Sequence, residues 1–118
     1  MWTVEYTDEF GQWWESLTGD EQVALDASVR LLEQIGPALG RPHVDTVKGS
    51  RHPNMKELRT QCKGHPLRTL FAFDPRRSAI LLVGGHKSGR KRFYQTAVPL
   101  ADRLYDTHLD ELREEGLL

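Results

Sequence analysis

Residues 55–85, MKELRTQCKGHPLRTLFAFDPRRSAILLVGG, decide the fold of this chain. Three segments with the composition of β-strands follow one another here: MKELRTQ (55–61), PLRTLFAFD (66–74) and AILLVGG (79–85). The links between them, CKGH and DPRRS, are short, and Pro75 suits a tight turn in the second. Because short links join antiparallel neighbours, the sequence predicts an antiparallel unit of three strands. The last segment is apolar throughout, as expected of a strand covered on both faces.

The segments before this unit predict one strand and two helices. WTVEY (2–6) alternates apolar and polar residues, which is the pattern of a half-buried strand. Thr7 can cap a short helix after it. TGDE (18–21) is a capping box that starts a longer helix, because its threonine and glutamate can each satisfy a backbone donor of the other. Gly36 and Pro37 end this second helix.

The remaining segments predict connections and a C-terminal helix. Residues 40–54 show no periodicity and indicate a long loop. VGGHKSGRKRFY (83–94) indicates a cationic loop whose glycines allow close approach to a polyanion. Apolar residues at helical spacing outline a helix over 101–112, with Pro99 at its first turn or at a kink and Gly116 at its C′ position. The order strand, helix, helix, strand, strand, strand, helix is an α+β fold with a small antiparallel sheet.

Length and composition suit a single domain spanning residues 1–118. Of the 118 residues 38% are apolar, enough for one compact core. The chain has no leader-like start and no run of about 18 apolar residues, so we expect a cytoplasmic protein with no membrane partner. Cys62 is the one cysteine, which excludes an internal disulfide and a Cys-rich zinc site. The five histidines lack paired ligand spacing, and the sequence therefore predicts no metal and no cofactor.

Charge is divided unevenly along the chain. The formal net charge is −1, yet residues 48–94 hold twelve Lys and Arg against Glu57 and Asp74, a local charge of +10. The remainder carries −11. Strand surfaces usually mix the two signs, so a basic middle between acidic flanks indicates a surface that meets phosphates. A set of solvated strand faces is the simpler alternative.

Three stretches of the chain resemble one protein family. MKELRTQCKGHPLRTLFAFDP (55–75), AILLVGGHKSGRKRFY (79–94) and ADRLYDTHLDEL (101–112) are similar to the phage-derived branch of the RelE/HigB toxins, in the RelE/ParE superfamily. The resemblance implies a RelE-like fold and the toxin of a type II toxin–antitoxin system, an endoribonuclease that cleaves mRNA in the ribosomal decoding site. It also implies a helix-turn-helix antitoxin encoded beside it, with which the toxin forms a hetero-oligomer.

The residues also suit RNA cleavage without a metal, because the 2′-hydroxyl of the RNA can attack its own phosphodiester. Arginines beside that phosphate stabilise its developing charge, and a tyrosine can act as a general acid. The catalytic candidates are Arg68, Lys87, Arg90 and Tyr94. The candidates for contacts with RNA or the ribosome are Lys56, Arg59, Lys91 and Arg92. We expect Arg68→Ala and Tyr94→Phe to reduce toxicity and to leave thermal stability nearly unchanged.

Other interpretations stay open at this point. Glu57 departs from some relatives, which carry lysines on this strand, so the role of the strand is not carried over. A ParE-like inhibitor of DNA gyrase and a noncatalytic RNA-binding domain are the alternative functions. Arg68 together with Tyr94 favours catalysis, whereas a Tyr94 that only packs under the last helix is the simpler alternative for that residue.

Overall fold

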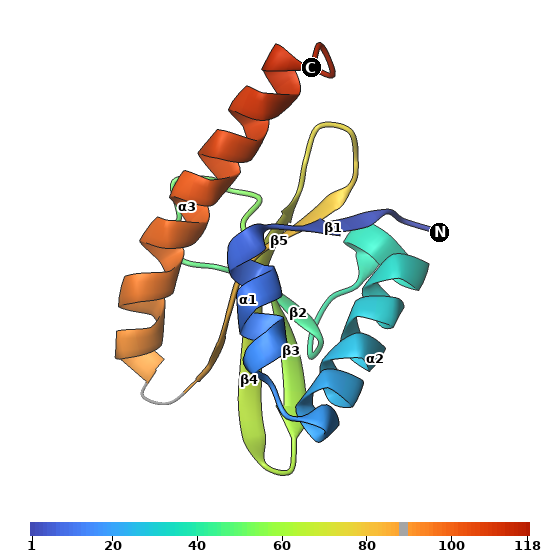
Figure 1. The fold of residues 1–118 in the computed structure, drawn as a ribbon, viewed down its shortest axis with the longest axis vertical. Helices are drawn as coiled ribbons and strands as arrows, with labels where there is room; N and C mark the ends of the chain where they lie inside the picture. Colours follow the sequence, from blue (N-terminus) through green and yellow to red (C-terminus); the bar gives the residue numbers. More distant parts are fainter. Residues whose placement is uncertain (88–89) are drawn as a thin grey trace.

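The computed structural model describes residues 1–87 and 90–118, with every side chain of these residues except those of Arg90 and Lys91. Figure 1 shows how the strands and helices of this part of the chain are arranged. In chain order the elements are β1 (Val4–Tyr6), α1 (Asp8–Ser16), α2 (Gly19–Ile35), a 3₁₀ helix (Gly36–Ala38), β2 (Val44–Thr46), β3 (Lys56–Cys62), β4 (His65–Phe73), β5 (Ala79–His86) and α3 (Arg90–Glu114).

The strands form one mixed sheet with the order β1-β5-β4-β3-β2. β3, β4 and β5 are antiparallel neighbours, as the sequence predicts. β1 adds in parallel to the outer edge of β5, with Val4 opposite Ala79. The sequence predicts only a loop over 40–54, whereas β2 lies there and pairs antiparallel with β3, Val44 opposite Leu58. The α+β fold is thus confirmed, with one short strand more than expected.

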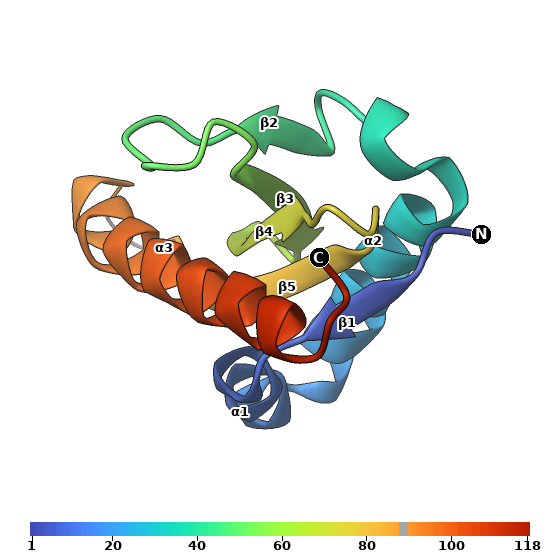
Figure 2. The same cartoon turned by 90° about the horizontal axis from the view of Figure 1, so that it is seen from above.

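The sheet separates two hydrophobic cores (Figure 2). α1 and α2 cover one face, where Leu25 and Phe71 are fully buried. α3 covers the other face together with the connection between β2 and β3, and there Leu70 and Ala101 are fully buried. Neighbouring residues of β4 therefore point into different cores, as strand alternation requires. Whether a side chain on β3 or β4 points to the α2 face or to the α3 face therefore depends on whether its residue number is odd or even.

The two N-terminal helices begin at the predicted capping residues. The Thr7 side chain accepts a hydrogen bond of 3.1 Å from the backbone N–H of Phe10. Thr18 and Glu21 form the reciprocal capping box. α2 ends at Gly36, which has φ +71° and whose Cβ, if present, would lie 2.2 Å from Nε1 of Trp2. Glycine alone satisfies both conditions, so Gly36 fixes how the N-terminus packs on the end of α2.

α3 begins at Arg90 and contains Pro99, so Pro99 is not in its first turn, and the helix starts earlier than the predicted range 101–112. The stretch 83–94 is accordingly not one loop, because its first residues end β5 and its last residues form the first turns of α3. Pro99 has no backbone N–H and leaves the carbonyl of Gln95 without its helical partner. Among the described residues, no helix has both the length and the apolar character of a membrane span.

Gly84 and Gly85 make room for aromatic side chains. A Cβ on Gly84 would lie 2.0 Å from the ring of Trp13 in α1, and a Cβ on Gly85 would lie 2.6 Å from the ring of Phe93 in α3. The two glycines therefore let both layers of helices pack closely on β5. The two glycines thus have a packing role, and the approach of this stretch to a polyanion stays a prediction.

Asp74, in the turn between β4 and β5, links three elements. Its buried carboxylate accepts hydrogen bonds from Arg76 (3.1 Å to Nε), from His108 of α3 (2.8 Å) and from the Ser78 backbone (3.2 Å). Arg76 also contacts Glu5 of β1 at 3.1 Å. Burial is the largest influence on Asp74 and opposes its ionisation, yet the hydrogen bonds from Arg76, His108 and Ser78 together hold its pKa below the ordinary value. Asp74 is therefore a structural carboxylate.

Candidate active site

The alternation of β3 and β4 turns three charged side chains toward α3. Leu58 is buried in the core beneath α2, so its neighbours Glu57 and Arg59 point to the opposite face of the sheet. Arg59 lies directly opposite Arg68 in the ladder between β3 and β4. These two arginines thus share one face, as the strand pattern predicts.

Tyr94 of α3 completes a cluster around the Glu57 carboxylate. The Tyr94 hydroxyl donates a hydrogen bond of 2.5 Å to Oε2, and Arg59 Nε donates one of 3.0 Å to Oε1. Arg68 Nε lies 4.0 Å from Oε1. We call Glu57, Arg59, Arg68 and Tyr94 the Glu57 cluster. Its single carboxylate brings together side chains from β3, β4 and α3.

The centre of the Glu57 cluster is shielded from solvent. Glu57 is 4% exposed and Arg68 is 8% exposed. Arg68 Nη1 donates a hydrogen bond of 3.0 Å to the Leu67 carbonyl, whereas the buried Nε has no hydrogen-bond partner within the described residues. A buried cation is tolerated only beside an anion, and Glu57 supplies that anion. Loss of Arg68 should therefore cost stability, contrary to the expectation from the sequence.

The surroundings of Tyr94 keep its hydroxyl protonated. Burial raises the pKa of Tyr94, and the hydrogen bond to the Glu57 carboxylate raises it further. Arg68 acts in the opposite direction but is outweighed. A phenol with a raised pKa holds its proton at neutral pH, so it suits a general acid and not a general base.

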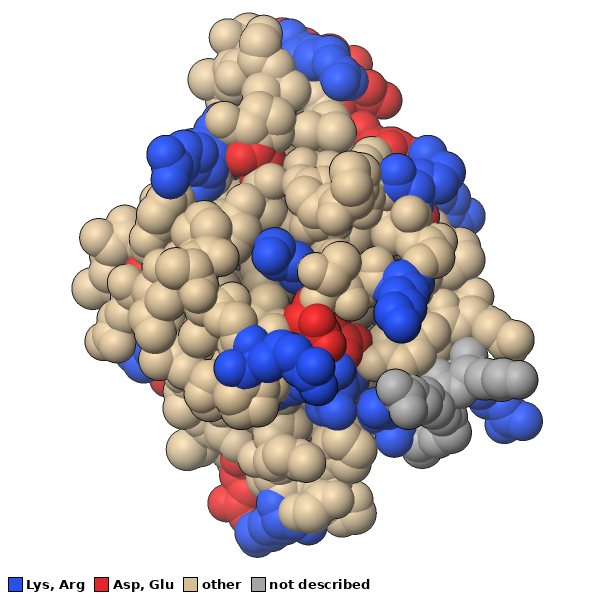
Figure 3. Space-filling model, turned by 180° about the vertical axis from the view of Figure 1, so that it is seen from behind, with Lys and Arg blue, Asp and Glu red and all other residues tan. Residues whose placement is uncertain are grey.

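A cleft of about 740 Å³ opens beside the cluster, between β2 with the residues that follow it and the first turns of α3. Glu57, Arg59 and Tyr94 line it, so the cluster can be reached from this side. Figure 3 views the molecule from the side of β2 and shows acidic atoms at the centre of this face with Lys and Arg around them. The cations of this face therefore surround carboxylates and do not form an unbroken basic patch.

Asp45 carries the second carboxylate of the cleft. It lies 3.3 Å from Arg59 Nη2 and 3.7 Å from Arg41 Nε. Arg59 is thus shared between Asp45 and Glu57, which fixes the guanidinium at the edge of the Glu57 cluster. Arg41 and Lys48 add two exposed cations to the lining.

Hydrogen bonds to α3 hold the segment that follows β2. Ser50 Oγ donates a hydrogen bond of 2.5 Å to Asp102, which is 4% exposed. Arg51 and His52 contact Asp106, one turn further along α3, at 2.5 and 2.8 Å. These contacts fix the spacing between the two sides of the cleft.

The other predicted site residues occupy different positions. Lys56 alternates with Glu57 and therefore points to the α2 face of the sheet. Lys87 follows β5, and its backbone N–H donates a hydrogen bond of 2.9 Å to the carbonyl of Pro66 in the strand that carries Arg68. Arg92 is exposed in the first turn of α3. The predicted side chains of Arg90 and Lys91 lie outside the described residues.

Glu57 is the functional candidate that sequence reasoning missed. The family resemblance implies lysines on this strand in some relatives. The sequence therefore marks the acidic Glu57 as the loss of a cation and not as the gain of a catalytic group. Two signals were available: Glu57 is one of two acids among twelve cations in residues 48–94, and it stands between Lys56 and Leu58 on a strand whose alternation turns it toward α3.

As for metals, no three His, Cys, Asp or Glu side chains in residues 1–87 and 90–118 come together as ligands.

The chain is similar to a known protein family and to curated proteins. The family model described as phage derived protein Gp49-like (DUF891) matches residues 12–106. The chain belongs to this family. One curated relative of this Gp49-like chain is the candidate toxin HigB2 of Mycobacterium tuberculosis, 42% identical over 115 residues. The match covers 96% of the chain but 57% of that relative, so the chain spans little more than half of its length.

A second relative supports the same assignment, and a solved structure supports the fold. The candidate toxin HigB3 of Mycobacterium tuberculosis is 48% identical over 93 residues, which cover 78% of the Gp49-like chain and 80% of the relative. The isolated E. coli RelE toxin matches the fold with a TM-score of 0.59 over 84% of this chain and 97% of that one, at 12% identity. The predicted resemblance to RelE/HigB-type toxins is confirmed.

Proposed function

We propose that this Gp49-like protein is the toxin of a toxin–antitoxin system and stops growth by cleaving mRNA on the ribosome, in the cytoplasm. The observation that supports this most is the hydrogen-bonded pair of Glu57 and Tyr94, set beside two arginines and lining a cleft large enough for a nucleotide. Metal-independent RNA cleavage needs a proton acceptor, a proton donor and cations at one phosphate. The Glu57 cluster contains all three.

In this mechanism the RNA 2′-hydroxyl attacks the adjacent phosphorus, and the bond between phosphorus and the 5′-oxygen breaks. Glu57 accepts the proton of the 2′-hydroxyl, and Tyr94 donates a proton to the leaving 5′-oxygen. Arg59 and Arg68 neutralise charge on the phosphate oxygens, and one such preorganised donor is worth roughly 10²–10³ in rate. The products are a 2′,3′-cyclic phosphate and a 5′-hydroxyl.

The contact between Tyr94 and Glu57 then resets the site. After cleavage Glu57 is protonated and Tyr94 is a phenolate, so one proton transfer along their 2.5 Å hydrogen bond restores both groups. While the Tyr94 hydroxyl faces the substrate, it no longer donates a hydrogen bond to Glu57. The Glu57 carboxylate then needs another hydrogen-bond donor. The buried Arg68 Nε, 4.0 Å from Oε1 and without a partner in the described chain, is placed to supply it.

Cleavage is tested with the purified protein, translating ribosomes and a defined mRNA, with new ends mapped by primer extension. We expect downstream fragments with a 5′-hydroxyl from the wild type and none from Glu57→Gln. Glu111→Gln, the same change at an exposed position of α3, is the matched control and should cleave normally. Intact mRNA with accumulated gyrase–DNA adducts would assign the protein to the gyrase inhibitors, and RNA binding without cleavage would make it a noncatalytic RNA-binding domain.

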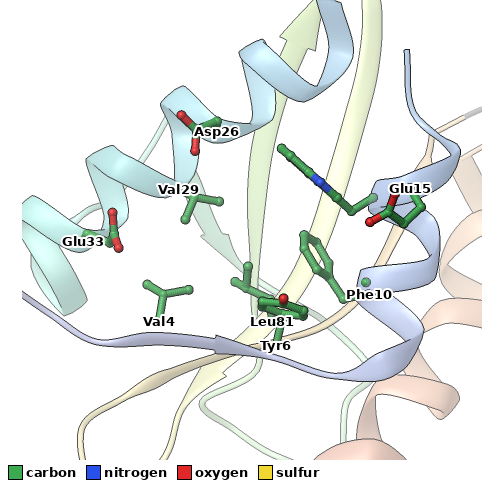
Figure 4. A pocket seen from close by; sticks show the side chains of 10 residues that line it. Val4, Tyr6, Phe10, Glu15, Asp26, Val29, Glu33 and Leu81 are labelled. Atoms are coloured by element: carbon green, nitrogen blue, oxygen red, sulfur yellow. The ribbon is translucent and has the colours of Figure 1, made fainter. Parts of the chain in front are cut away.

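Such a toxin requires an inhibitor, and we propose an antitoxin, encoded beside it, that binds on the far side of the sheet. A groove of about 300 Å³ lies there between β1, α1 and α2 (Figure 4). Apolar and acidic residues line it, among them Val4, Tyr6, Phe10, Leu81, Glu15, Asp26 and Glu33. Glu15 and Glu33 form no ion pair in the described part of the chain, so the groove complements a segment with apolar anchors beside Lys or Arg.

A further inference from the structure

We infer that the cleft between β2 and α3 binds one nucleobase of the RNA and that Gln95 reads this base. The inference rests on the proposed RNA-cleaving function, which it extends from the phosphate to the base. It makes Gln95 a specificity-determining residue that stands next to Tyr94 in the sequence.

The walls of the cleft suit the flat face of a base. Val47 and Val98 line it from opposite sides and are 8% and 6% exposed, so the cleft reaches down to the hydrophobic core under α3. Pro99 and the ring of Tyr94 belong to the same lining. Ligand sites of this kind combine apolar walls with a few polar groups that fix orientation, and single-stranded RNA presents its bases to such sites.

Gln95 supplies polar groups that nothing in the described protein satisfies. Its side chain lines the cleft, is exposed, and has no hydrogen-bond partner in residues 1–87 and 90–118. One amide offers a donor and an acceptor side by side, which matches the adjacent acceptor and donor on a base edge. In addition, Pro99 leaves the backbone carbonyl of Gln95 without a helical donor. A base in the cleft can therefore meet two acceptors and one donor from a single residue.

The position of Gln95 relative to the reacting atoms supports the same assignment. Tyr94 and Glu57 line the same cleft and would hold the scissile phosphate, so a base attached to a sugar of that phosphate can reach the cleft beside it. Arg41 and Lys48 lie on the side of β2, where a flanking phosphate can meet them. The hydrogen bonds of Ser50 and of the Arg51 backbone to Asp102 keep that side at a fixed distance from α3.

The test separates base reading from cleavage. The probes are four ribotrinucleotides that differ only in one base and carry a 2′-deoxy sugar at the cleavage position, so they bind but cannot react. Their affinities are measured for the full chain as wild type, Gln95→Ala and Gln12→Ala, an exposed glutamine of α1 on the other face of the sheet. A bidentate contact discriminates among bases by roughly five- to a hundredfold.

We expect the wild type and Gln12→Ala to prefer one base by such a factor, and Gln95→Ala to bind all four probes within about twofold of one another. Cleavage sites on natural mRNA should broaden in the same variant. An unchanged preference in Gln95→Ala, or no preference or no binding in the wild type, would overturn the inference even if cleavage is found. Loss of preference in Gln95→Ala without any cleavage by the wild type would support the base site and reject the ribonuclease.

Discussion

The carboxylate of Glu57 balances the charge of Arg68 inside the protein, where either group alone would be costly. Removing one partner of a buried ion pair typically costs about 3–5 kcal/mol, because the other charge stays buried without compensation. The 4.0 Å between Arg68 Nε and Glu57 Oε1 is long, and Arg59 contacts the same oxygen at 3.0 Å. Glu57 therefore keeps one cation when the other is lost, which places the cost at the lower end of that range.

A double-mutant cycle tests this pair. Arg68→Met and Glu57→Gln should each reduce the free energy of unfolding by about 3 kcal/mol. The double variant should lose clearly less than the sum, because it leaves no uncompensated buried charge. Urea denaturation at neutral pH measures all four proteins. Strictly additive losses would show that Arg68 and Glu57 do not interact in the folded state.

Tyr94→Phe should reduce mRNA cleavage at least a hundredfold, since it removes the proposed general acid, and such groups contribute about 10²–10⁴ in rate. It should cost about 1.5 kcal/mol of stability, the lower end of the range for one hydrogen bond to a charged group. Because the pKa of Tyr94 is raised, the hydroxyl stays protonated, and cleavage by the wild type should not decline between pH 7 and about pH 9.

Tyr105→Phe is the matched control for this change. Tyr105 lies on the same helix, is buried, and its hydroxyl contacts Asn54 and the Phe73 carbonyl at 3.3 and 3.4 Å, away from the Glu57 cluster. The two variants should lose similar stability and differ in activity. Equal cleavage by both variants would show that Tyr94 only packs against its neighbours and is not the general acid.

At the scale of elements, Asp74 joins β1, the turn between β4 and β5, and α3. Its folded pKa is lowered, so its contribution to stability is present above the unfolded value of about 4 and is lost as pH falls through the folded value. Asp74→Asn should therefore cost about 2–3 kcal/mol at pH 7 and less near pH 3. Denaturant titrations at the two pH values measure this. An equal loss at both would contradict a role for the ionised carboxylate.

Local patterns were enough to predict most elements. The capping residues Thr7 and Thr18 mark helix starts through contacts within one turn, and the hairpins of β3, β4 and β5 need only short links. β2 has three residues and exists because Val44 meets Leu58, a partner that the local sequence does not reveal. The start of α3 was missed because Pro99 resembles a first-turn proline, whereas the packing of Phe93 on Gly85 carries the helix further back.

The candidate site was predictable only in part, for a similar reason. Arg59, Arg68 and Tyr94 could be proposed from charge, strand parity and family resemblance. The sequence does not show that their charges and hydroxyl converge on Glu57, because the contact joins residues 57 and 94 across the sheet–helix interface. Gln95 was not a candidate either, since its position depends on where α3 begins.

At the scale of the whole molecule, the sheet places the cleft and the acidic groove on opposite faces. Charge reversal in the groove, Glu15→Lys with Glu33→Lys, should weaken binding of the neighbouring gene's antitoxin at least tenfold, because basic residues of the antitoxin would then face like charge. Cleavage without antitoxin should stay unchanged. Binding is measured by calorimetry with both full-length proteins.

Arg92→Glu provides the comparison from the opposite face. Arg92 is exposed in the first turn of α3, so its reversal should weaken binding to the ribosome and leave antitoxin affinity intact. If Arg92→Glu and the groove variants weaken antitoxin binding equally, the antitoxin covers the basic face and competes with the ribosome.

The order in which β1, β5 and α3 are synthesised limits when the fold and the proposed site can assemble. β1 is made first, yet its partner Ala79 is made 75 residues later than Val4, and Tyr94 follows only after β5 is complete. At the usual pace of about 5–20 residues per second, the nascent chain spends seconds with its first strand unpaired and its reactive groups apart. The proposed site can therefore assemble only after the first turns of α3 have been made, because Tyr94 belongs to that helix.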